Sequence, residues 1–114
     1  MRNIFIACDS SNVKVVKKII NQTQVKVKDY RIGYKFGLEF FYSKNGRRFI
    51  EKLKVKNVWL DVKTFDIPNT SYAAIKSLKD LKNISYVTVH VSGGIEMLKA
   101  VKKAVKKYNK KLKI

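Results

Sequence analysis

The feature that most constrains the fold is an alternation, repeated four times, of a short apolar run with a longer stretch of helical periodicity. The apolar runs, each of strand length, are Ile4–Cys8, Tyr30–Phe36, Val58–Val62 and Tyr86–Val91. The stretches in which apolar residues recur every three or four positions are 10–22, 38–54, 69–82 and 92–108. The chain therefore reads as β-α-β-α-β-α-β-α.

Strands that alternate with helices pair in parallel, because right-handed crossovers place each helix on a face of the sheet. The runs are apolar on both faces, as expected for buried strands. Each unit takes roughly 25–30 residues, which matches one unit of a (β/α)8 barrel of about 250 residues. The 114 residues hold four such units. We therefore predict an α/β fold, a (β/α)4 half of a TIM-type barrel with parallel strands.

The helical stretches carry apolar stripes, and local signals mark their ends. Ser10 or Ser11 is a plausible N-cap for the first helix, and Asn45-Gly46 interrupts the second stretch. The stripes expected to face the core are Val13, Val16 and Ile20; Phe49, Ile50 and Leu53; Ala74, Ile75, Leu78 and Leu81; and Leu98, Val101, Val105 and Tyr108. The charged end, "KKYNKKLKI", predicts a frayed, solvated tail.

One domain, residues 1–114, is expected, since Pro68 is the only proline and no Gly/Ser-rich linker occurs. The single cysteine, Cys8, lies inside an apolar run and predicts a small buried side chain rather than a reactive thiol. No run approaches the roughly 20 residues of a membrane span. The N-terminal apolar run is too short for a signal-peptide core. These features favour a cytoplasmic protein without membrane association.

The charge balance is unusual, with 26 Lys and Arg residues against 8 Asp and Glu, a net charge of +18. Such a chain attracts polyanions, so nucleic acid is a possible partner. The basic residues are nevertheless spread along the whole chain and are mostly lysine, accompanied by many Ile and Asn residues. An AT-rich genome produces that mixture without selection on charge, and this compositional interpretation is the favoured one.

Polar residues collect where the predicted strands end. Asp9 follows the first strand, Lys35 lies in the second, Asp61 and Lys63 end the third, and the last set is His90 and Ser92. In parallel α/β folds that edge binds ligands and carries the chemistry. The alternative is that each is simply a solvated strand end. Convergence of four strands favours a site.

The densest group is Asp61, Lys63 and Asp66. Residues two apart on a strand point to one side, so Asp61 and Lys63 are expected to face a common ligand space. A fixed anion beside a lysine that can deliver a proton suits a reaction in which a carbanion forms. A surface salt-bridge cluster is the alternative. A Mg²⁺ ion on the two carboxylates is conceivable, although Lys63 already supplies positive charge, and no metal site is predicted.

The stretch "DVKTFDIPNT", residues 61–70, resembles the signature of the orotidine 5′-phosphate decarboxylase family. The surrounding order is similar too: "IFIACD", "IGYKFG" and "VTVHVSGG" end the other strands. The resemblance covers Ile4 to about Tyr108. Related sugar-phosphate enzymes share the Asp-x-Lys-x-x-Asp core but are not expected to continue with Ile-Pro-Asn-Thr.

The resemblance implies decarboxylation of orotidine monophosphate without a cofactor or metal. It implies that Lys35, Asp61, Lys63 and Asp66 are catalytic, with Lys63 as proton donor and Asp61 facing the leaving carboxylate. Asp9 and Lys35 would contact the ribose. Asp66, Ile67 and Thr70 would reach the substrate site across a dimer interface. His90 matches a family histidine, for which an orienting or packed role is favoured over a catalytic one. For Ser92-Gly93-Gly94, an N-cap with a turn is favoured, and anion binding by backbone N–H groups is the alternative.

The family has a complete barrel, and the phosphate-binding half of that barrel would follow strand four. The resemblance therefore implies that a second copy of the chain or a separate C-terminal half completes the site, with doubtful activity otherwise. An inactive remnant is one alternative. A basic module that binds phosphate ligands or nucleic acid is another. The exposed sheet edges at strands one and four would invite pairing.

Overall fold

A computed structural model describes residues 1–114, and four parallel strands form one sheet in it, in the order β1-β2-β3-β4. The strands are β1 (Arg2–Ala7), β2 (Tyr30–Gly37), β3 (Val58–Thr64) and β4 (Ile84–Val89). The helices are α1 (Val13–Thr23), α2 (Leu38–Phe41), α3 (Gly46–Lys52), α4 (Pro68–Ser77) and α5 (Gly94–Tyr108), with 3₁₀ turns η1 (Leu78–Asp80) and η2 (Val91–Gly93). The predicted parallel α/β half-barrel is confirmed.

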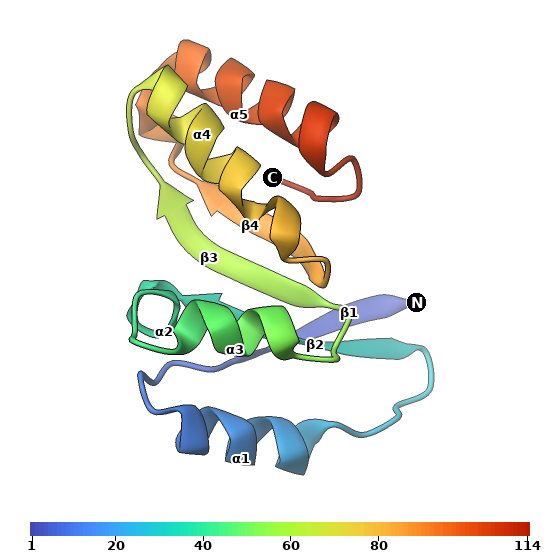
Figure 1. Cartoon of the computed structure of the whole chain (residues 1–114). Coiled ribbons are helices and arrows are strands. Elements are labelled where there is room, and N and C mark those ends of the chain that lie inside the picture. The colour runs from blue at the N-terminus through green and yellow to red at the C-terminus, as the bar shows by residue number, and fades with distance from the viewer.

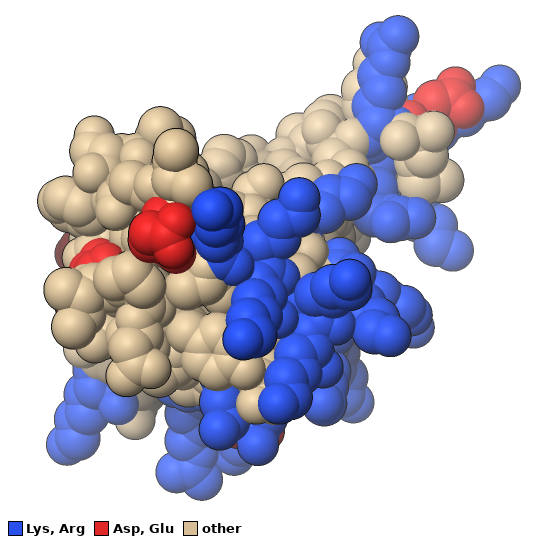
Figure 2. Space-filling view, turned by 90° about the horizontal axis from the view of Figure 1, so that it is seen from above, with Lys and Arg blue, Asp and Glu red and all other residues tan.

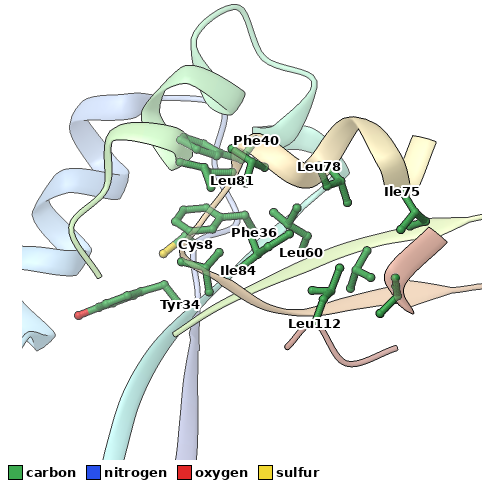
Figure 3. Close-up of a cluster of buried hydrophobic side chains, with 14 of the residues drawn as sticks. Cys8, Tyr34, Phe36, Phe40, Leu60, Ile75, Leu78, Leu81, Ile84 and Leu112 are labelled. Atoms are coloured by element: carbon green, nitrogen blue, oxygen red, sulfur yellow. The ribbon is translucent and has the colours of Figure 1, made fainter. Parts of the chain in front are cut away.

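All the helices pack their apolar stripes on the same face of the curved sheet. In Figure 1, α1, α2 and α3 lie in the lower part of the view, and α4 and α5 lie in the upper part. Between the helices and the strands lies the hydrophobic core, in which Phe36 of β2 and Phe40 of α2 pack with ring centroids 5.0 Å apart (Figure 3). Leu60 of β3 and Leu81 are completely buried in the same cluster.

The opposite face of the sheet, which we call the inner face, is concave. Phe5 of β1 contacts both Trp59 of β3 and Tyr86 of β4, with centroid distances of 5.5 and 5.4 Å. In addition, the side-chain amide of Asn3 donates to the Tyr86 hydroxyl at 3.4 Å. Strands β1 and β4 are not neighbours in the sheet, so these contacts require a strongly curled sheet, as expected for half of a barrel.

Gly33 of β2 lies beneath this aromatic cluster. A Cβ atom there would collide with the Asn57 carbonyl oxygen and would lie 2.7 Å from the Phe5 ring. Only glycine therefore allows the inner face to close this tightly.

Several local expectations were wrong. The N-cap of α1 is Asn12, whose side chain accepts from the Lys14 N–H at 2.9 Å, rather than Ser10 or Ser11. Ala74 is exposed, and α5 buries Met97 and Ala104 with Val101 and Val105 instead of Leu98. The break at Asn45-Gly46 is confirmed, because α2 and α3 are separate helices.

The C-terminal residues are ordered against the sheet rather than frayed. Lys113 pairs in parallel with Tyr86 of β4, accepting from the Val87 N–H at 2.9 Å and donating to Ser85 O at 2.9 Å. Leu112 is 4% exposed and belongs to the core cluster. Part of the β4 edge is therefore covered. No helix in the structure combines the length and the apolar character that crossing a bilayer requires.

Candidate active site

Four charged side chains of alternating sign lie side by side at the carboxyl ends of the first three strands. Lys35 Nζ lies 3.7 Å from Asp9 Oδ1 and 3.3 Å from Asp61 Oδ2. Lys63 Nζ lies 3.0 Å from Asp61 Oδ1. The order across the rim is Asp9, Lys35, Asp61, Lys63. The Asp61 carboxylate therefore has one ammonium group on each side.

Asp61 is the centre of this row, and its side chain is only 15% exposed. Burial alone would raise its pKa, but hydrogen bonds from Lys63, Thr88 and Lys35 outweigh burial and hold the pKa below its ordinary value of 3.8. Asp61 is therefore an anion at neutral pH. Because the Asp61 carboxylate is largely buried, the alternative of an exposed surface salt-bridge cluster does not fit this residue.

An irregularity in β3 aims Asp61 and Lys63 at the same place. Leu60 pairs with Val87 and Thr64 with Val89, so three residues of β3 lie opposite the single residue Thr88 of β4. Such a bulge bends a strand and re-aims its side chains. Lys63 adopts φ +46°, which is unusual for a residue other than glycine. The predicted convergence of Asp61 and Lys63 is confirmed, but the bulge produces it instead of regular alternation.

Thr88 bridges the bulge, and sequence reasoning did not identify it as part of the candidate site. Its hydroxyl accepts from the Lys63 backbone N–H at 3.0 Å and donates to Asp61 Oδ1 at 2.9 Å. A single threonine thus replaces a lost ladder hydrogen bond and orients the carboxylate. The signal in the sequence was a polar residue among the apolar ones of "VTVHV", two residues before His90.

Asp66 does not join the charged row. Its Oδ1 accepts from the Ile67 backbone N–H at 2.7 Å, and its backbone carbonyl accepts from the Ser71 hydroxyl at 3.1 Å, so Asp66 shapes the turn before α4. Lys63 was expected to lie between the carboxylates of Asp61 and Asp66. It pairs with Asp61 but makes no ion pair with Asp66. Asp66, Ile67 and Thr70 are all exposed at the start of α4.

His90 and Phe65 form a stacked pair on the same rim, with centroids 5.0 Å apart. His90 donates its backbone N–H to Thr64 O at 2.9 Å. His90 is exposed, so its stacking on Phe65 is a surface contact and does not bury the ring. Ser92 and Gly93 lie in the turn η2, and Gly93 is the N-cap residue of α5, although no side-chain hydrogen bond caps the helix.

The arrangement suits proton transfer beside a fixed anion. Lys63 is 58% exposed on its side chain, so its ammonium group is accessible from solvent while remaining paired with Asp61. Lys35 is more enclosed and holds the other oxygen of Asp61. No group of three or more His, Cys, Asp or Glu side chains is placed to hold a metal ion.

The sequence and the fold are similar to proteins of one family. A model of the orotidine 5′-phosphate decarboxylase / HUMPS family matches residues 2–114. Orotidine 5′-phosphate decarboxylase of Malacoplasma penetrans is 35% identical over 99% of this chain and 47% of its own length. The enzyme of Fusobacterium nucleatum is 36% identical over 91% of this chain and 42% of its own.

Solved structures agree with these matches. The crystal structure of orotidine 5′-phosphate decarboxylase from Lactobacillus acidophilus superimposes with a TM-score of 0.77 at 34% identity, over 93% of this chain and 46% of that one. The chain thus spans about half the length of the relatives it matches, and its sheet corresponds to half of their barrel. By sequence and by fold, the chain belongs to the orotidine 5′-phosphate decarboxylase / HUMPS family.

Proposed function

We propose that this chain provides one half of an orotidine 5′-phosphate decarboxylase site, in which the substrate lies over Asp9, Lys35, Asp61 and Lys63. The observation that carries the proposal is the ion-paired row Lys35–Asp61–Lys63. Relatives with that enzyme's name are 35–39% identical to the chain. The reaction would belong to pyrimidine nucleotide synthesis in the cytoplasm.

In the proposed reaction, the bond between C6 of the pyrimidine and the carboxylate breaks, and carbon dioxide leaves. The bonding electron pair stays on C6, and the Lys63 ammonium group delivers a proton there, which gives uridine monophosphate. Asp61 contributes electrostatically, because its negative charge opposes the substrate carboxylate before cleavage and no longer meets an anion afterwards. Neither a cofactor nor a metal takes part. Asp9 and Lys35 hold the ribose.

The other half of the barrel has to supply the groups that grip the phosphate, since in barrels of this type those come from the last loops. The sheet supports the idea of a second half, because β1 pairs only with β2 and leaves its other edge without a neighbouring strand. We propose that a second half-barrel completes the site.

A dimer contact is proposed at the loops after β3 and β4. Phe65 and Ile67 are 62% and 66% exposed, and Val91 and Ile95 are similarly exposed. Exposed apolar side chains grouped beside polar ones are typical of interaction sites. Asp66, Ile67 and Thr70 would then enter the partner's site, as the family resemblance implies.

The test is an assay of orotidine monophosphate conversion by the purified chain at high concentration. It is run on the chain alone and on the chain mixed with a polypeptide carrying the second half of a full-length relative. We expect conversion with the second half present and much less, or none, without it. Absence of conversion in both samples would contradict the proposal.

A matched pair of variants identifies the groups responsible. In the complemented sample, Lys63→Gln removes the proton donor and should lower turnover by at least about 100-fold, the usual contribution of a general acid. Lys79→Gln removes an exposed lysine from η1, outside the site, and should leave turnover unchanged. Equal turnover of the two variants would exclude Lys63 as the donor. Mass measurement in solution separates a monomer from a dimer.

A further inference from the structure

The helix α5 carries an uninterrupted row of lysines on its solvent side. Five lysines at spacings of three and one form this row, which we call the lysine stripe: Lys99, Lys102, Lys103, Lys106 and Lys107. All five are exposed. At this spacing residues share one side of a helix, and the stripe extends about 12 Å along the axis.

The surroundings of the stripe are basic as well. No acidic residue occurs after Glu96, and Lys110, Lys111 and Lys113 follow the helix. Lys76 of the neighbouring helix α4 lies 5.6 Å from the Tyr108 ring, which Lys107 also approaches at 5.5 Å. Figure 2, which looks onto the side where α4 and α5 lie, shows the basic side chains gathered into one broad area. Basic side chains of α4, α5 and the C-terminal segment thus lie together on this side of the molecule.

We propose that the lysine stripe of α5 binds the phosphate backbone of duplex nucleic acid without sequence preference. Successive phosphates of one strand are spaced at about 3.4 Å along the duplex axis, so about 12 Å of helix can meet three or four of them. The stripe contains no arginine, the side chain that most often reads bases through paired hydrogen bonds. Point charges from lysine favour contact with phosphates alone.

A membrane surface fits the stripe less well. Basic helices that bind membranes insert an apolar face between the lipids. The apolar face of α5 is unavailable, because Met97, Val101 and Ala104 are completely buried against the sheet. Beyond Ile95 in the first turn, the exposed side chains of α5 are charged. A polyanion that needs no apolar contact, such as nucleic acid, is therefore the better occupant.

The test uses a labelled 20-base-pair DNA duplex, fluorescence anisotropy and a series of salt concentrations. The triple variant Lys102→Gln, Lys103→Gln, Lys106→Gln removes three stripe lysines that make no ion pair and no contact with an aromatic ring. If each contacts a phosphate, the slope of log affinity against log salt should become less steep by about 3. A second duplex of unrelated sequence should bind the unmodified chain equally well.

The matched control removes three exposed lysines from another helix. Lys14→Gln, Lys17→Gln, Lys18→Gln lowers the net charge by the same amount on α1. We expect this control to keep most of the affinity and slope, while replacement of the three stripe lysines by arginine retains binding. Equal losses in both glutamine variants would overturn the proposal, because composition alone would then explain binding. Failure to bind the duplex at about 50 mM salt, or binding only to vesicles of anionic lipid, would overturn it as well.

Discussion

The hydroxyl of Thr88 donates a 2.9 Å hydrogen bond to Asp61 Oδ1, the oxygen that also accepts from Lys63. The same hydroxyl accepts the backbone N–H of Lys63. Thr88 therefore ties the carboxylate and the lysine of the site to β4, at the point where β3 leaves regular pairing. The geometry of the candidate site depends on this one side chain as much as on the charges themselves.

Thr88→Val tests that dependence, because valine keeps the shape and removes both hydrogen bonds. Leaving the Lys63 N–H without a partner should lower the free energy of unfolding by about 1–3 kcal/mol. Urea denaturation measures this change. Thr70→Val removes an exposed hydroxyl that makes no hydrogen bond within the chain and should change stability by less than about 0.5 kcal/mol. Similar effects of the two substitutions would show that Thr88 does not hold the bulge.

The lowered pKa of Asp61 predicts a particular loss of stability in acid. The folded-state pKa lies below the ordinary value of 3.8 that applies to the unfolded chain. The ionised carboxylate therefore contributes stability that is complete above that ordinary value and is lost as the pH falls through the lower folded value.

Asp61→Asn removes this contribution, so the difference between the unfolding free energies of the two proteins should shrink below about pH 4. Urea midpoints between pH 2 and pH 7 measure it. A difference that stays constant over this range would mean that Asp61 has no lowered pKa.

The strands were predictable from the sequence to within two residues at each end, because apolar runs mark them directly. The expectation that both faces are buried was wrong for β1, most of whose residues are exposed. The positions of Asp61 and Lys63 were predictable for a weaker reason. Alternation places residues two apart on one side, yet a bulge with Lys63 at φ +46° brings them together. Bulges depend on pairing with the neighbouring strand, and no local pattern shows which residue of β4, here Thr88, will bridge one.

The contacts of Asp66 and the burial of the C-terminal tail were harder to predict from the sequence, for related reasons. The spacing of Asp66 from Lys63 suggested a shared charge network, but a turn before α4 directs its carboxylate to the Ile67 N–H. Leu112 is surrounded by charged residues in the sequence, which suggested a solvated tail. Its burial depends on the free edge of β4, a feature of the assembled sheet.

Cys8 should be unreactive in the folded protein. Burial first, and the negative charge of Asp9 second, raise the pKa of its thiol to about 11, although Lys35 opposes them. At pH 8 only about one thiol in a thousand would then be ionised, and the thiolate is the reactive form. A disulfide reagent that releases a coloured product on reaction with a thiol should modify Cys8 rapidly in urea and very slowly in buffer. Comparable rates in the two solutions would show that the side chain is accessible.

The C-terminal segment offers the sharpest test of the fold, since Leu112 and Ile114 lie two residues apart with opposite surroundings. Leu112 is 4% exposed within the core, whereas Ile114 is 52% exposed. Leu112→Ala should lower the free energy of unfolding by about 2–5 kcal/mol, the range for a large buried side chain reduced to alanine.

Ile114→Ala should cost much less, because most of that side chain already contacts water. Urea denaturation of both variants makes the comparison. If Leu112→Ala were as mild as Ile114→Ala, the pairing of Lys113 with Tyr86 would not persist in solution, and the edge of β4 would be free for a partner strand along its whole length. A large difference would instead mean that a partner completing the barrel must displace, or extend, the short segment that already occupies this edge.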